Sequence, residues 1–399
     1  MEEQFRIGGW LAPDNTVEAY ELAKGCGINT MYLLGEACRF AGFDEQIEAI
    51  KACQGAGVDA IPLVSHRQGT FKDKRFLDYD NVHAIMLSDE PNAERYPLLE
   101  EQMKEFFELY PKTMRCEVNL LPNYAPLEQL KTSSYFEYVE KYIQLHEKML
   151  PEGNILSVDH YPMYVKEGRV VIMPLWLRCL STLTYFSRRK NLSTHCFIQT
   201  MAFGTSNDVE QDFSTLRFQF MVYLAFGFRA FSHFCYASPG VDAQFLAHQE
   251  AIVGRDGKPT RLYEEVRKAN ALVQTFAKWY LPYTHKGTRS YAPEDTKVPA
   301  FEDWAEEVDF ENASLVKVQT DCPALVGKFV NEQGEEAFFV THYNWPKEAN
   351  GKVELTFSGK KDFILHRDGK TEEKKNCDCL QIELEAGNGI FVQVKERKE

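Results

Sequence analysis

Short apolar segments and helical segments alternate along most of this chain, and this alternation constrains its fold more than any other feature. Each apolar run is followed by a polar loop and then by a stretch with helical periodicity. Eight runs are predicted as strands, over residues 5–11, 28–34, 58–64, 82–87, 114–120, 155–158, 196–200 and 228–234. Helices are predicted over 16–24, 43–53, 96–109, 135–149, 175–190, 208–225 and 261–280. A repeat of roughly 25 to 40 residues is typical of parallel sheets covered by helices.

Eight such units are the number that closes a (β/α)8 barrel, and the sequence predicts this fold. Three of the predicted strands follow a helix through a glycine-bearing link, as expected where the chain leaves a helix in a left-handed conformation. A doubly wound open sheet is the main alternative. It is disfavoured because no Gly-x-Gly-x-x-Gly segment follows the first strand and no phosphate-binding loop occurs.

After residue 280 the pattern changes to consecutive strands without helices between them. These strands are predicted over 324–330, 336–342, 353–357, 363–366 and 389–394, with turn-forming residues at 331–334 and 367–370. We therefore predict an α/β (β/α)8 TIM barrel over residues 1–290 and a small C-terminal antiparallel β-sandwich over 291–399. The connecting segment is expected between Pro282 and Val308.

The charge of the chain disfavours two classes of partner. It carries 45 Lys and Arg against 59 Asp and Glu, a formal net charge of −14, and contains no run of basic residues. Nucleic acid and anionic membrane surfaces are therefore not expected partners. The N-terminal residues lack the basic and apolar regions of a signal peptide, and no stretch of 18 apolar residues occurs. These features predict a cytoplasmic protein.

The ten cysteines are mostly scattered singly, as expected for free thiols in a reducing compartment. The one close pair, Cys377 and Cys379, lacks a second pair of ligands at zinc spacing, which favours ordinary strand cysteines over a zinc site. Neither a metal ion nor another cofactor is expected.

Acidic residues follow three of the predicted strands. In a barrel of this kind the chemistry lies at the C-terminal ends of the strands, so these residues are candidates for the site. Asp89 and Glu90 end the fourth strand just before Pro91, Asp159 ends the sixth, and Glu36 follows the second. Two carboxyl groups that face one mouth can carry out acid and base chemistry together.

Each acidic segment also has a structural interpretation. Asp89 could cap the following helix, and Asp159 could begin a turn. Glu36, predicted as a binding residue, could instead pair with Arg39 within its loop. The position of Asp89 and Glu90 at the fourth strand end favours the functional interpretation for that pair.

Further polar and aromatic side chains are expected to complete the mouth as binding residues. They lie at or just after other strand ends: Trp10, His66, Asn119, His160, Tyr161, Gln199, His233 and Tyr236. Trp10 can act as a stacking platform or as a plug of the barrel, and His233 can equally be a core group. Gln199 ends the seventh strand, where its amide can bind a hydroxyl group but cannot act as a nucleophile.

The segment Ser88-Asp89-Glu90-Pro91-Asn92 resembles the bacterial barrel glycoside hydrolases, in which the fourth strand ends in Asn-Glu-Pro or Asp-Glu-Pro. A broader and less specific similarity extends over 8–10, 118–122, 158–162, 198–199, 224–230, 257–270 and 385–391. The resemblance implies that Glu90 is the proton donor. The clan A families place a second Glu at the end of strand seven, where this chain has Gln199. The Asp-Glu pair also resembles the substrate-assisted β-N-acetylgalactosaminidase family, which implies that Asp89 orients the acetamido group of the substrate.

The sequence therefore predicts a glycoside hydrolase with Glu90 as general acid/base and Asp89 or Asp159 as the second carboxylate. Its expected partner is a small saccharide or glycoside, and self-association into a homo-oligomer stays open. The alternative is a non-catalytic carbohydrate-binding barrel that has lost its nucleophile, as Gln199 suggests. A barrel aldolase or isomerase would need a strand-end lysine or a phosphate-binding glycine loop, and the sequence shows neither.

Overall fold

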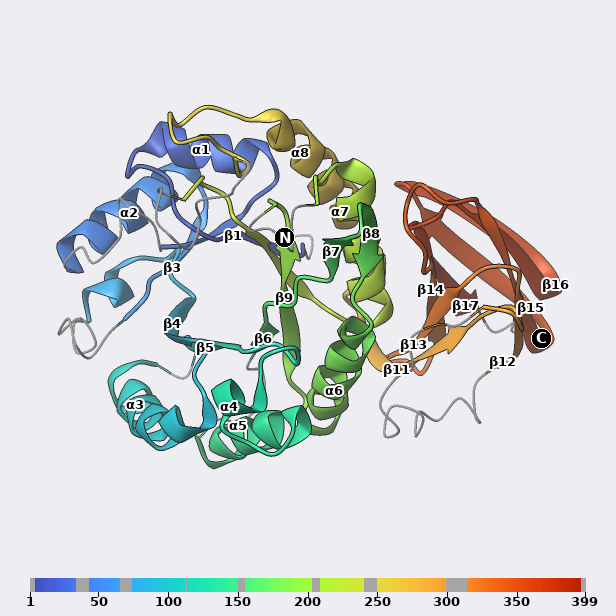
Figure 1. Cartoon of the computed structure of the whole chain (residues 1–399), viewed down its shortest axis with the longest axis horizontal. Helices are drawn as coiled ribbons and strands as arrows, with labels where there is room; N and C mark the ends of the chain where they lie inside the picture. The colour runs from blue at the N-terminus through green and yellow to red at the C-terminus, as the bar shows by residue number, and fades with distance from the viewer. Residues whose placement is uncertain are drawn as a thin grey trace.

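The structure is a computed structural model that describes residues 4–33, 43–64, 74–111, 113–149, 155–202, 209–239, 250–296, 298 and 314–395. A ring of strands is surrounded by helices. A separate β domain lies against one side of this barrel (Figure 1).

Eight parallel strands form the barrel, in the order β3-β2-β1-β10-β9-β6-β5-β4. Their bounds are β1 (Arg6–Gly9), β2 (Thr30–Tyr32), β3 (Asp59–Ile61), β4 (Ala84–Asp89), β5 (Arg115–Leu120), β6 (Ile155–Val158), β9 (Ser193–Gln199) and β10 (Ala230–Phe234). A parallel bridge between Leu63 and Met86 joins the two ends of this sheet. Every predicted barrel strand overlaps an observed one, and the (β/α)8 barrel is confirmed.

The helices lie around the outside of the ring (Figure 1). Their bounds are α1 (Val17–Gly25), α2 (Phe43–Ala56), α3 (Tyr96–Leu109), α4 (Leu127–Leu130), α5 (Tyr135–Met149), α6 (Leu175–Lys190), α7 (Phe213–Ala225), α8 (Arg261–Gln274) and α9 (Ala277–Tyr280), with short 3₁₀ turns η3 (Arg75–Asp78) and η4 (Ala93–Arg95). Helix α7 begins later than predicted because Asp212 caps it, accepting a hydrogen bond from the Thr215 backbone N–H at 3.0 Å. The predicted helix over 261–280 is two helices, α8 and α9.

A hairpin that the sequence analysis did not predict follows the sixth barrel strand. It consists of β7 (Met163–Lys166) and β8 (Arg169–Ile172). Its turn residues, Glu167 and Gly168, both have positive φ, which suits a two-residue hairpin turn. The hairpin lies between β6 and α6, and the seventh barrel strand, β9, follows α6.

The C-terminal domain is an antiparallel sheet in the order β11-β13-β14-β17-β15-β12, with β16 paired to β15. The strands are β11 (Tyr283–Tyr291), β12 (Leu315–Thr320), β13 (Ala324–Asn331), β14 (Glu336–His342), β15 (Gly351–Arg367), β16 (Lys370–Leu384) and β17 (Gly389–Lys395). Where two strands were predicted there is one long strand, β15, whose pairing is irregular between Thr356 and Phe363. Both of its halves contribute to a buried core, so the sheet folds over on itself. The predicted division at residue 290 falls inside β11, which pairs with β13.

The barrel and the C-terminal domain share one hydrophobic core through helix α7. This helix is buried over nearly its whole length, as expected for a helix whose apolar residues are spread around its circumference. The Thr341 hydroxyl donates to the Met221 carbonyl at 3.0 Å, and Arg217 pairs with Glu385 at 2.9 Å. A Cβ atom on Gly327 would lie 2.1 Å from the Ala225 oxygen. The domains therefore pack too closely for a side chain at Gly327.

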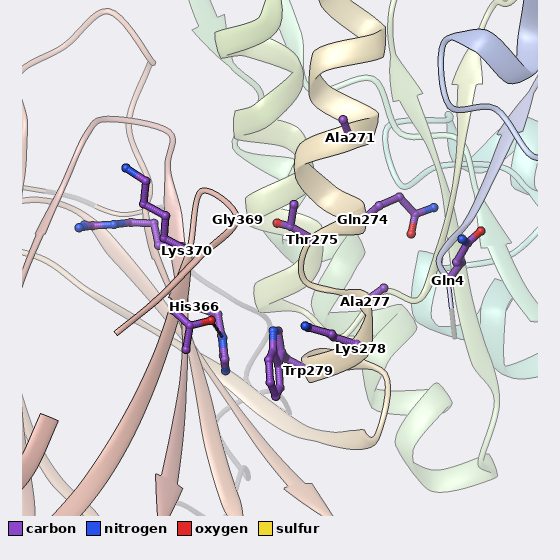
Figure 2. A pocket seen from close by; sticks show the side chains of 12 residues that line it. Gln4, Ala271, Gln274, Thr275, Ala277, Lys278, Trp279, His366, Gly369 and Lys370 are labelled. Atoms are coloured by element: carbon purple, nitrogen blue, oxygen red, sulfur yellow. Dashed lines mark hydrogen bonds between the residues drawn. The ribbon is translucent and has the colours of Figure 1, made fainter. Parts of the chain in front are cut away.

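A polar cleft of about 460 Å³ lies between α8–α9 and the turn from β15 to β16 (Figure 2). The Trp279 ring stacks on His366 with centroids 4.2 Å apart, and the Lys278 ammonium lies 4.5 Å from the Trp279 ring centroid. Arg367 donates to the Glu383 carbonyl at 2.5 Å. The side chains of Lys278, Trp279 and His366 thus contact one another across the two domains. Arg367 is bonded within the C-terminal domain.

The nine cysteines of the described segments are free, including Cys377 and Cys379 on β16. Within these segments no group of three or more His, Cys, Asp or Glu side chains is placed to hold a metal ion. None of the helices observed there is long and apolar enough to cross a bilayer.

Candidate active site

The ends of β4, β5 and β6 bring three carboxyl groups and one amide together at the C-terminal mouth of the barrel. Asp89 pairs in register with Asn119, and Asn119 with Ser157, two residues before Asp159. The pairing of β4 with β5 shifts between Met86 and Ser88, a β-bulge that changes which side chains face the barrel interior. Parallel strands end at one edge, so residues far apart in the sequence meet there.

Asn119 bridges two of the carboxyl groups. Its side-chain nitrogen donates to Asp89 Oδ1 at 3.2 Å and to Asp159 Oδ1 at 3.0 Å. Because both oxygens lie within hydrogen-bond distance of one nitrogen, they are no more than about 6 Å apart. Asp89 does not cap the next helix, since the residue before η4 is Asn92 and no side chain caps that turn.

Glu90 adopts an uncommon backbone conformation, with φ of +46°. A non-glycine residue in this region is strained, and such strain is frequent at functional sites. Its backbone N–H donates to the Asn119 carbonyl at 2.9 Å, which extends the β4–β5 pairing by one residue. In this conformation the Glu90 carboxyl lies within hydrogen-bond reach of Asp159.

A buried tyrosine holds the loops that follow β4 and β5. The Tyr138 hydroxyl, on α5, donates to the Pro91 carbonyl at 2.7 Å and accepts from the Leu121 backbone N–H at 3.2 Å. Tyr138 is fully buried, so this cross-link is shielded from water. It fixes Pro91, and with it the preceding Glu90.

The surroundings favour the protonated form of all three carboxyl groups. Burial, and after it the charge of Glu90, raises the pKa of Asp89 to about 6. Burial and the charges of Glu90 and Asp89 raise the pKa of Asp159 well above its ordinary value. Burial also raises the pKa of Glu90, although its hydrogen bond with Asp159 opposes this. The protein around Asp89 and Glu90 shields them from bulk water, although both keep exposed surface at the mouth. In the described segments no ion pair joins the three carboxyl groups to a basic side chain.

Aromatic side chains line the mouth beside these carboxyl groups. Trp10 is partly buried, with its ring 5.4 Å from Tyr32 and 5.2 Å from Phe197 between centroids, so it closes the barrel while keeping some exposed surface. Tyr161 is buried against Phe234 at 5.1 Å. The structure brings both predicted residues to the mouth.

Tyr124, in the loop after β5, is a site residue that the sequence analysis missed. It is 37% exposed, and its ring meets the ring of His160 edge-on at 4.9 Å. Burial, and after it the charge of Asp159, raises the pKa of the Tyr124 hydroxyl, and the charge of Glu90 acts in the same direction. Its only signal in the sequence is its place in a loop that follows a barrel strand.

The predicted binding role of His160 is not supported by its position. The side chain has no exposed surface, and burial lowers its pKa to about 3, so its imidazole is neutral. Neither ring nitrogen has a hydrogen-bond partner within the described segments.

Two further predicted binding residues face away from the mouth, and the structure corrects them. His233 is fully buried, with its nitrogens 2.7 Å from Thr200 Oγ1 and 2.8 Å from Asn270 Oδ1, and burial lowers its pKa to about 4. Tyr236 is also buried and donates to the Ala19 carbonyl on α1 at 3.4 Å. Both side chains contact the outer helices and belong to the core.

Glu36 and His66, the two remaining predicted binding residues, lie outside the described residues.

Gln199 is buried, and both polar atoms of its side-chain amide bond to the backbone of Met163. Oε1 accepts from the Met163 N–H and Nε2 donates to the Met163 carbonyl, both at 2.9 Å. Its predicted role as a substrate contact is therefore corrected: the amide anchors the start of the β7–β8 hairpin to the seventh barrel strand.

Replacing Gln199 by Ala is expected to lower the free energy of unfolding by about 2–4 kcal/mol, because the Met163 N–H and carbonyl would be left buried without partners. Urea denaturation followed by circular dichroism measures this. Gln54→Ala, on the exposed surface of α2, is the control and should change the free energy by less than about 0.5 kcal/mol. Equal effects of the two substitutions would contradict the anchoring role.

No protein-family model matches this sequence, and the search of curated proteins found no match. Solved structures do resemble it. A β-galactosidase from Bacillus circulans sp. alkalophilus superposes with a TM-score of 0.63 and 8% sequence identity, covering 99% of this chain and 100% of that one. A putative α-galactosidase from Bacteroides fragilis superposes with a TM-score of 0.52 and 8% identity, covering 100% of this chain and 81% of that one.

These likenesses extend over essentially the whole chain, so both parts of the fold are shared. The class defined by the fold is a (β/α)8 barrel followed by a C-terminal β domain.

Proposed function

We propose that this protein is a glycoside hydrolase whose chemistry takes place among Asp89, Glu90 and Asp159. The observation that carries the proposal is the convergence of three carboxyl groups with raised pKa values at the C-terminal mouth of the barrel. Cleavage of a glycosidic bond needs one carboxylic acid to protonate the leaving oxygen and a second group to attack or stabilise the sugar cation. The likeness to the two named galactosidase structures supports the proposal.

The pKa values suggest how the roles divide. Glu90 and Asp159 lie within hydrogen-bond reach, and burial raises the pKa of both, so we infer that the pair holds one proton between them and can supply an acid. The pKa of Asp89, about 6, leaves it mostly ionised at pH 7. We assign Glu90 as the proton donor, Asp159 as the buried carboxyl group with which Glu90 shares its proton, and Asp89 as the carboxylate that faces the developing positive charge.

A panel of aryl glycosides that includes N-acetylated sugars tests the proposal. At least one should be hydrolysed, with activity that depends on Glu90. Binding of sugars by calorimetry without turnover would instead support the alternative, a non-catalytic carbohydrate-binding barrel. The observation that favours this alternative is Gln199, which places an amide rather than a carboxylate at the seventh strand end.

Replacing Asp159 by Asn is expected to move the basic limb of the kcat/KM profile to lower pH. This limb reports loss of the proton shared with Glu90. In the wild type, losing that proton leaves two adjacent negative charges, which holds the pKa high; in the variant only Glu90 becomes charged at the pair, so its proton leaves at lower pH. Initial rates measured between pH 4 and 9 give the pH of this basic limb. A basic limb at unchanged or higher pH would contradict the shared proton.

A further inference from the structure

A chain of hydrogen bonds runs through the barrel interior beneath the carboxyl groups. Ser157 Oγ lies 2.9 Å from Asn119 Oδ1 and 2.8 Å from His195 Nδ1, and His195 Nε2 lies 2.8 Å from Ser232 Oγ. These four residues come from the adjacent strands β5, β6, β9 and β10, and each is no more than 4% exposed. The interior of the barrel is therefore polar at this level, and its polar groups are connected.

Counting hydrogens gives this chain a direction. Both N–H groups of Asn119 are used on the two aspartates, so its oxygen must accept from the Ser157 hydroxyl. Ser157 has no second hydrogen, so its oxygen must accept from His195 Nδ1–H. A neutral imidazole then has a bare Nε2, which accepts from the Ser232 hydroxyl.

The imidazole of His195 is neutral for two reasons. Burial, and after it the nearby Arg6 guanidinium, holds the pKa of His195 well below its ordinary value. Arg6 is paired with Glu117, and the Tyr32 hydroxyl donates to Glu117 at 2.7 Å. The Tyr32 ring lies 6.0 Å from the imidazole, so Arg6, Glu117 and Tyr32 form a linked group of titratable side chains beside it.

We propose that His195 is a positioning residue: its Nδ1–H tautomer orders the Ser157 hydroxyl, which holds the Asn119 amide with both N–H groups toward Asp89 and Asp159. The opposite tautomer would place the Ser157 hydrogen on His195, leaving Asn119 free to turn its oxygen toward the two aspartates. The orientation of the Asn119 amide matters because its N–H groups donate to both aspartates and lower their pKa values, against the stronger effect of burial. The kinetic consequence rests on the proposed function, whereas the tautomer does not.

The tautomer can be measured directly on the wild-type protein. In protein labelled with ¹⁵N-histidine, the His195 signals, assigned by their loss in His195→Gln, should show a protonated Nδ1 and a bare Nε2. This pattern should persist from pH 5 to 8. A protonated Nε2, or titration within this range, would overturn the proposal whether or not the protein is an enzyme.

Ser157→Ala tests the transmission to the carboxyl groups. With the amide no longer ordered, the ¹³C-detected titration midpoint of Asp89 should rise by about 0.5–1 pH unit, because a hydrogen bond to the carboxylate is weakened. If the protein hydrolyses glycosides, the acidic limb of its kcat/KM profile should move to higher pH by a similar amount. The value of kcat should fall about tenfold, and KM should change little.

Ser181→Ala is the matched control. Ser181 is equally buried but donates to the Arg178 carbonyl on α6 at 3.0 Å, away from the barrel interior. It should leave the Asp89 midpoint unchanged. An unchanged midpoint in folded Ser157→Ala would overturn the positioning role. A shifted midpoint in a protein without activity on any glycoside would support the positioning role and contradict the proposed function.

Discussion

Replacing Glu90 by Gln is expected to lower kcat about 10²- to 10⁴-fold on an aryl glycoside with a poor leaving group, because the leaving oxygen would no longer receive a proton. Gln has nearly the same volume as Glu, so the site keeps its shape. The loss should be much smaller on a dinitrophenyl glycoside, whose phenolate departs without protonation. Comparing kcat on the two substrates separates a proton donor from a residue that only binds.

Glu94→Gln provides the control for this substitution. Glu94 lies on η4, four positions along the chain, with an exposed side chain 3.8 Å from Lys131. Its replacement should leave kcat unchanged on both substrates. Equal losses on the two glycosides in Glu90→Gln would contradict the role as donor, and unchanged activity would remove Glu90 from the mechanism.

Replacing Asp89 by Asn should lower kcat about 10²- to 10³-fold to a similar extent on both substrates. The expected role of Asp89 is to stabilise positive charge on the sugar, and that charge develops whatever the leaving group is. The amide keeps the shape of the side chain but removes its charge. Values of kcat measured on the two aryl glycosides for the wild type and the variant test this expectation.

Asp80→Asn is the matched control, since Asp80 lies exposed in the turn before β4, at the opposite end of the strand. It should not change kcat. If the loss in Asp89→Asn were confined to the substrate with the poor leaving group, Asp89 rather than Glu90 would be the proton donor.

Much of the fold follows from local patterns in the sequence. The eight barrel strands and helices α3, α5 and α6 could be predicted because apolar periodicity and strand-bounding residues are local signals. Strand β16 could not, since its first half is rich in Lys and Glu and exposed, and it forms only by pairing with β15. The β7–β8 hairpin was missed because it is too short to show a strong alternation.

The sequence by itself determined that Asp89, Glu90 and Asp159 lie at the mouth, because parallel strands in a barrel all end on the same side. Only the tertiary structure decided which neighbours join them. Side chains alternate between the two faces of a strand, so a one-residue change of register turns a side chain from the mouth to the outer helices. That register places His233 and Gln199 in structural roles, and it places His195, which carries no sequence signal, beneath the carboxyl groups.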